Sequence, residues 1–300
     1  MGPNQSSSLA IVTIFLLCLS TVIILLRFWV RFSIKYFGLD DWLMLFGYIL
    51  FIGTCIAVII GSNNGFGTLD INLTKEQMII GQKCLLVGQV TYCLASVCIK
   101  SGICVTLVRL SNTRVVTYPA YAVITISVLA GIATFVILLS ICKPIKAQWE
   151  PSAGKCASTS VTINASYFIS ATYILTDFSC VVLPIGLLWN LHLSWKIKAP
   201  VVCILSFGAL ASAATIVRII YFRNYSNKTN YLHGVANISL WTVIELGVGL
   251  SAGSAPALRP LLRLISSGSW TDSRPSRYQP FRRRRESSHF ISTDTATRDA

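Results

Sequence analysis

Long apolar runs separated by short polar segments make up most of the chain. A helix crosses the hydrocarbon core of a bilayer with roughly 20 apolar residues, and seven segments meet this requirement. The connections between them are short, so no soluble domain is inserted. The expected spans are Leu9–Leu26, Trp42–Ile60, Lys83–Val108, Tyr118–Ile141, Ile163–Trp189, Ala199–Val217 and Val235–Leu258. The pattern predicts an all-α membrane protein whose domain, residues 9–264, is a bundle of seven transmembrane helices.

The composition supports a membrane protein and argues against nucleic-acid binding. Charged residues make up 12% of the chain and hydrophobic residues 54%, whereas about 25% charged residues is usual in soluble domains. The net charge is +14, but nine of the 25 Lys and Arg residues lie at or after Arg259. Most of the others flank apolar runs. This distribution is typical of a membrane protein with a basic tail, so we expect the lipid bilayer to be its partner.

The basic residues also predict the orientation, because cytoplasmic loops are enriched in Lys and Arg. Basic residues follow the first, third and fifth expected spans, and the tail follows the seventh. The N-terminal segment, residues 1–8, is therefore expected to be extracellular and the C-terminus cytoplasmic. Sequons for N-glycosylation fall in the expected outer segments, and the candidates are Asn4, Asn72, Asn224 and Asn227.

The tail, residues 265–300, is expected to be disordered and cytoplasmic. Its run of four arginines, residues 282–285, is suited to anionic lipid of the inner leaflet. Ser287 follows this run and is a candidate for phosphorylation, which would offset part of the positive charge. An unmodified, solvated tail is the alternative.

Ten cysteines divide into two groups by their position. Seven lie within expected spans, where we interpret them as small apolar packing residues. Cys142 and Cys156 lie at the two ends of an outer loop that faces the oxidising secretory lumen. A disulfide between them is expected, with Cys84 at the outer end of the third span as the competing partner.

Three ionisable residues lie deep within expected spans: Lys100, Asp177 and Glu245. Such groups are costly in a bilayer, so they face the bundle interior and find partners. We predict that Lys100 pairs with Asp177 or Glu245. The pair is interpreted as a structural contact that fixes helix packing, with a switch or an ion path as the alternative.

One short motif suggests an enzyme, but its context does not. Residues 249–253 match G-x-S-x-G, which in hydrolases needs a strand-turn-helix elbow and a histidine partner. Here the motif lies within an expected membrane helix, and no histidine lies at bilayer depth. We interpret these small residues as helix packing and expect neither catalytic nor metal-binding residues.

Several short motifs occur in a specific order from about Arg27 to Leu264. Their residues are Asp40, Asp41, Trp42, Pro144, Trp149, Pro184, Trp189, Arg218, Trp241, Pro256, Arg259 and Pro260. Together these motifs resemble the fungal rhodopsin-domain family. The Gly65-Phe66-Gly67 segment departs from the family pattern, because Thr68 and Leu69 follow it where a histidine is usual.

The resemblance implies a receptor-like protein of a fungal plasma membrane or endomembrane. An unknown small ligand would act from outside, and an unknown cytoplasmic signalling partner would read the response. No retinal cofactor is expected, because the last span contains no lysine for a Schiff base. A transporter or proton channel that uses the deep charges is the second hypothesis, and an intramembrane hydrolase that uses Ser251 is the third.

Overall fold

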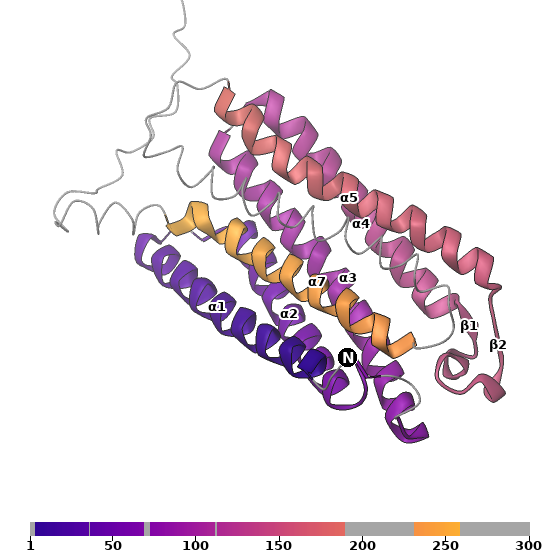
Figure 1. Ribbon diagram of the computed structural model, residues 1–300. Helices are drawn as coiled ribbons and strands as arrows, with labels where there is room; N and C mark the ends of the chain where they lie inside the picture. Colours follow the sequence, from indigo (N-terminus) through magenta and orange to yellow (C-terminus); the bar gives the residue numbers. More distant parts are fainter. Residues whose placement is uncertain (1–3, 36, 69–72, 112, 190–230, 259–300) are drawn as a thin grey trace, which may run out of the picture.

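The computed structural model describes residues 4–35, 37–68, 73–111, 113–189 and 231–258, which are almost entirely helical (Figure 1). Two short strands and three short 3-10 helices accompany the long helices. The long helices are α1 (Asn4–Ile34), α2 (Leu39–Asn63), α3 (Lys75–Ser111), α4 (Arg114–Ser140), α5 (Thr159–Trp189) and α7 (Tyr231–Ser254). The short elements are β1 (Cys142–Lys143), η2 (Ile145–Gln148), η3 (Pro151–Ala153), β2 (Lys155–Cys156) and η4 (Ala255–Leu258).

The long helices lie side by side in a bundle in which α3 is central (Figure 1). Helix α3 packs against α2, α4, α5 and α7, and α1 covers α2 and α7. We call the end of the bundle with β1 and β2 the hairpin end. We call the opposite end, where α1 ends and α2 begins, the arginine end. Helices α3, α5 and α7 all begin at the hairpin end, so their successive residues run toward the arginine end.

The distribution of side chains is the inverse of that in a soluble protein. Large apolar side chains cover the outside, with Phe15 65% and Phe168 76% exposed, whereas Arg27, Asp40 and Asp41 are at most 1% exposed. Five of the described helices are long and apolar enough to cross a membrane. They span Ser6–Ile34, Leu39–Asn63, Lys75–Leu110, Arg114–Ser140 and Ala236–Leu258. The chain is thus a multi-pass helical membrane protein, as predicted.

Helices α1 and α3 exceed the predicted spans by more than the other helices do. Helix α1 begins at Asn4 rather than Leu9 and continues to Ile34 rather than Leu26, so residues 4–8 of the predicted extracellular segment are helical. The prediction ended this span before Arg27 because a charge is costly in a membrane helix. In the structure Arg27 is paired with carboxylates, and the helix continues through it.

A capping box explains why α3 begins at Lys75 and not at Lys83. The Thr74 hydroxyl accepts a hydrogen bond from the Gln77 backbone N–H at 3.3 Å, and the Gln77 side chain accepts one from the Thr74 N–H at 3.0 Å. This reciprocal pair satisfies two N–H groups that have no partner within the helix. The added turns are polar, so the hydropathy pattern did not reveal them.

The segment between α4 and α5 forms a small hairpin closed by a disulfide. Strands β1 and β2 are antiparallel, and the opposed residues Cys142 and Cys156 are bonded through their sulfurs. This confirms the predicted pairing, and Cys84 is free. Within the hairpin segment Trp149 lies under the ammonium of Lys83, which is 5.5 Å from the ring centroid. This contact attaches the hairpin to α3.

Several sequence predictions concern residues outside the described ranges. These are the span Ala199–Val217, the tail with Ser287, the sequons Asn72, Asn224 and Asn227, and the family residues Arg218, Arg259 and Pro260.

Candidate functional site

A buried ion pair lies in the middle of the bundle, between α3 and α5. The Lys100 ammonium is 2.8 Å from Oδ1 of Asp177, and both side chains are less than 10% exposed. The same ammonium donates a hydrogen bond to the Thr176 hydroxyl at 3.1 Å and lies 4.6 Å from the centroid of the Tyr173 ring. The predicted pairing of Lys100 with one of the two deep carboxylates is therefore present, and the partner is Asp177. A carboxylate, a hydroxyl and an aromatic face together replace the water that the ammonium has lost.

The third deep charge, Glu245 on α7, has a different partner. The hydroxyl of Tyr92 on α3 lies 2.9 Å and 3.0 Å from the two carboxylate oxygens of Glu245. Glu245 is 5% exposed and is the second carboxylate, after Asp177, that interacts electrostatically with Lys100. One ammonium thus faces two carboxylates on two different helices. The sequence identified all three charges but not Tyr92, because a tyrosine in an apolar helix gives no distinctive signal.

Tyr92 and Tyr173 separate these charges from a cavity at the hairpin end. Their ring centroids are 6.1 Å apart, and both residues line a cavity of about 170 Å³ that the charged groups do not line. The cavity lies in the halves of α2, α3, α4, α5 and α7 nearest the hairpin. A group bound there would contact the tyrosines directly and the three charges through them.

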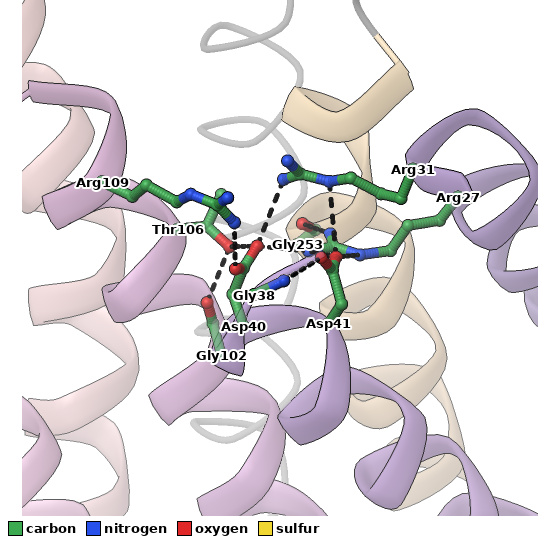
Figure 2. A network of polar contacts seen from close by, with 9 residues as sticks. All are labelled: Arg27, Arg31, Gly38, Asp40, Asp41, Gly102, Thr106, Arg109 and Gly253. Carbon is green, nitrogen blue, oxygen red and sulfur yellow. Dashed lines mark hydrogen bonds and ion pairs between the residues drawn. The ribbon is translucent and has the colours of Figure 1, made fainter. Parts of the chain in front are cut away.

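A second group of charges lies at the arginine end, where three arginines surround two aspartates (Figure 2). Arg27 Nη2 is 2.8 Å from Oδ2 of Asp40 and 2.7 Å from Oδ1 of Asp41. Arg31 also reaches both carboxylates, at 3.2 Å and 3.4 Å. Arg109 reaches Oδ1 of Asp40 at 2.8 Å. We call these five residues the arginine network.

The arginine network joins four helices at one point. Asp40 and Asp41 lie in the first turn of α2, where negative charge is favoured by the helix dipole. Arg27 comes from α1, and its Nη1 donates a hydrogen bond to the Gly253 carbonyl of α7 at 2.7 Å. From α3, Arg109 binds Asp40, and the Thr106 hydroxyl donates to the same carboxylate at 3.2 Å. Relative movement of α1, α2, α3 or α7 would break at least one of these bonds.

The sequence pattern alone does not bring the members of this network together. Arg27 and Arg31 are among the basic residues that follow the first expected span, Arg109 follows the third, and Asp40 and Asp41 belong to the family motif. The sequence does contain a signal for ion pairing here, since two acidic residues follow two arginines within 14 positions at the edge of an apolar run. That arrangement is costly unless the opposite charges meet.

The other residues that carried the family resemblance do not join the arginine network. Trp42 follows the two aspartates but is 61% exposed, with its ring centroid 5.9 Å from that of Phe37 on the outer surface. Trp241 is half-buried on α7, one turn before Glu245. The remaining described members are distributed along the chain: Pro144 and Trp149 in the hairpin segment, Pro184 and Trp189 in α5, and Pro256 in η4.

The G-x-S-x-G residues lie at a close approach between helices. A methyl group on Gly249 would lie 3.2 Å from Ile99, and one on Gly253 would collide with Met44. Small residues here allow α7 to pack against α3 and α2. Between them, the Ser251 hydroxyl donates to the Gly247 carbonyl of its own helix at 2.8 Å. The motif is part of a regular helix and does not form a strand-turn-helix elbow.

Comparison with known proteins gives one family and several relatives. The profile of the family described as "Fungal rhodopsin domain" matches residues 26–264. "Polyenoic acids biosynthesis gene cluster protein Ba17b" of Metarhizium anisopliae is 26% identical, over 82% of this chain and 71% of its own length. "Receptor GIN3" of Arthrobotrys oligospora is 28% identical, over 74% of this chain and 54% of its own. "Fugralins biosynthesis cluster protein 2" of Gibberella zeae is 24% identical, over 87% of this chain and 67% of its own. No solved structure matches the chain.

Proposed function

The chain belongs to the fungal rhodopsin domain family, and from this premise we propose that it is a receptor-like sensor that works without retinal. The observation that carries the proposal is the series of contacts along α3. Tyr92 lines the cavity, Lys100 belongs to the central ion pair, and Arg109 belongs to the arginine network. The similarity to Receptor GIN3 supports the proposal, although the chain spans only 54% of that protein.

In the proposed mechanism a small ligand enters the cavity and changes the balance between two arrangements of the helices. A ligand shifts such an equilibrium only by binding the two arrangements with different affinity. Tyr92 and Tyr173 are suited to provide this difference, because each contacts both the cavity and a buried charge. The response would reach the arginine network about 25 Å away along α3, at roughly 1.5 Å per residue, and an unknown signalling partner would read it there.

The expected coupling can be measured without knowing the ligand. Tyr92→Phe removes the hydroxyl that binds Glu245 and leaves the aromatic ring in place. We expect hydrogen–deuterium exchange of the segment 37–43 and of residues 106–110 to change about fivefold or more, the low end of typical allosteric coupling. The measurement is exchange mass spectrometry on the full chain in lipid nanodiscs.

Tyr48→Phe is the matched control for this experiment. It also removes one tyrosine hydroxyl and one hydrogen bond, here the bond of 2.7 Å between Tyr48 and Thr21. Tyr48 lies on α2 and its hydroxyl binds Thr21 of α1 rather than Glu245, so exchange at the arginine end should change less than in Tyr92→Phe. The receptor proposal would be contradicted if both substitutions changed hydrogen–deuterium exchange at the arginine end equally. It would also be contradicted if Tyr92→Phe left this exchange unchanged.

The topology that we propose for this sensor has seven spans, with the N-terminus outside and the C-terminus in the cytoplasm. It is supported by the basic residues at the arginine end and by the basic tail. A tag before Met1 should be accessible to antibody on intact cells, and a tag after Ala300 only after permeabilisation. Two tags on the same side would mean an even number of spans and would contradict this topology. The basic tail is proposed to bind anionic lipid of the inner leaflet.

We propose no retinal, because α7 offers no lysine for a Schiff base. We also propose no enzymatic activity, since Ser251 hydrogen-bonds to its own helix. On this proposal Ser251→Ala would leave function unchanged.

A proton channel or transporter is the second candidate, and the ammonium that faces two buried carboxylates supports it. Ionisable residues inside the membrane recur in proton and substrate pathways. In proteoliposomes that contain a pH-sensitive dye, this function predicts a proton flux that is lost in Lys100→Met. A dye signal equal to that of empty liposomes would favour the receptor.

A further inference from the structure

The described walls of the cavity at the hairpin end are uncharged. Among the described residues that line it there is no Asp, Glu, Lys or Arg. Lys100, Asp177 and Glu245 lie behind Tyr92 and Tyr173 and already bind partners there. A charged ligand would lose its hydration on entering the cavity and find no opposite charge on these walls, which is strongly unfavourable.

The lining is mainly apolar, with a few polar groups that have no partner. The Gln89 carboxamide and the hydroxyls of Ser170 and Ser239 make no hydrogen bond within the described part of the chain, and Ser239 is only 7% exposed. The threonine hydroxyls differ, because Thr242 donates to the Ile238 carbonyl of its own helix. A carboxamide both donates and accepts hydrogen bonds, so Gln89 can bind either a hydroxyl or a carbonyl group.

The volume limits the size of the ligand. The cavity holds about 170 Å³, whereas an engineered apolar cavity of roughly 150 Å³ holds one benzene molecule. A benzene ring with one small substituent therefore matches the space. A sterol, a complete lipid or a peptide would not fit entirely within this space.

We propose that this cavity binds a small, uncharged, mainly apolar molecule that carries one hydroxyl or carbonyl group. The apolar part packs between the helices, and the polar group binds Gln89 or one of the two serines. This inference rests on the proposed function only in taking the cavity as the sensing site. It adds the chemical class of the ligand, which the receptor proposal leaves open.

Matched probes test the ligand class. Benzyl alcohol and benzylammonium have the same ring and the same number of non-hydrogen atoms, but only the second is charged. Toluene lacks the polar group. We expect saturation-transfer NMR on the full chain in nanodiscs to give binding of benzyl alcohol at least about tenfold tighter than that of benzylammonium. Equal or tighter binding of benzylammonium would overturn the proposal.

Two neighbouring substitutions separate the cavity from the bilayer, into which these probes also partition. Ser170 lines the cavity, whereas Ala171 is exposed on the outer surface of α5. Ser170→Phe should reduce the benzyl alcohol signal about tenfold or more, while Ala171→Phe should leave it unchanged. A signal that is equal in wild type and Ser170→Phe, including no signal in either, would overturn the proposal.

A third substitution does not fill the cavity and tests the polar contact. Gln89→Leu keeps the approximate size of the side chain and removes the carboxamide. Benzyl alcohol should then bind several-fold more weakly, while toluene binds as before. Unchanged binding of benzyl alcohol in both Gln89→Leu and Ser170→Phe would refute the assigned site.

The same probe distinguishes this inference from the receptor proposal. Benzyl alcohol binding that depends on Ser170 but leaves exchange at the arginine end unchanged would refute the sensor and support the ligand class. The opposite result is that Tyr92→Phe changes hydrogen–deuterium exchange at the arginine end but benzyl alcohol does not bind in the cavity. This result would refute the ligand class and support the sensor.

Discussion

Replacing Arg27 by methionine is expected to destabilise the protein by about 3–5 kcal/mol, the usual effect of removing one partner from a buried ion pair. Arg27 is completely buried and binds Asp40, Asp41 and the Gly253 carbonyl. Without it the two carboxylates keep only Arg31 and Arg109 as positively charged partners in the network, and the hydrogen bond from α1 to the Gly253 carbonyl of α7 is lost. The free energy of unfolding can be measured by SDS titration in mixed micelles.

Arg31→Met is the control for this substitution. Arg31 binds the same two carboxylates, but at longer distances, 3.2 Å and 3.4 Å, and its side chain is 13% exposed. We expect a loss below about 1 kcal/mol, close to that of an exposed ion pair. The loss of stability in Arg27→Lys should lie between the losses in Arg27→Met and Arg31→Met. Lysine keeps the charge but lacks the planar group that reaches two carboxylates and a carbonyl at once. Similar losses in Arg27→Met and Arg31→Met would mean that burial does not determine the strength of the network.

The second large effect on stability is expected at the central ion pair. The stability losses of the two single substitutions there should not add up in the double variant. Lys100→Met and Asp177→Leu each remove one member of a buried ion pair, so each should destabilise the protein by about 3–5 kcal/mol. The double substitution removes both charges and leaves apolar groups of similar size. It should therefore be more stable than either single variant, with a coupling energy of about 2 kcal/mol or more.

A parallel cycle with Glu245→Gln provides the comparison. Glu245 binds Tyr92 and is not the direct ion-pair partner of Lys100. The glutamine removes the charge but keeps an oxygen that can accept a hydrogen bond from the Tyr92 hydroxyl. Coupling of Lys100 to Glu245 should thus be smaller than coupling to Asp177. Additive effects in the Asp177 cycle would show that the pair contributes no net interaction.

In the proposed sensor, positions along α3 would link these charge groups to function as well as to stability. Tyr92, Lys100 and Arg109 belong to one helix of 37 residues that lies at the centre of the bundle. A shift of α3 relative to α7 would affect the Tyr92–Glu245 bond directly and the arginine network at the other end. The same contacts that stabilise the resting arrangement would therefore need to change during a response.

The sequence by itself determined the class of protein and the places where charge would need partners. Apolar runs of about 20 residues can satisfy their backbone in lipid only as helices, so the all-α membrane class follows from hydropathy. The cost of a charge in lipid identified Lys100, Asp177 and Glu245 as inward-facing. Two cysteines on one oxidising side predicted the disulfide of Cys142 with Cys156, which the structure contains.

Only the tertiary structure decided which groups meet. Local spacing places Asp177 and Glu245 at similar depths, but the relative rotation of α3, α5 and α7 determines that Lys100 binds Asp177 while Tyr92 binds Glu245. Asp40 and Arg109 are 69 residues apart in sequence, and no periodicity links them. The cavity likewise depends on five helices whose side chains leave a space between them. Packing between helices depends on side-chain shapes across the whole bundle, and a pattern read along a single chain does not contain that information.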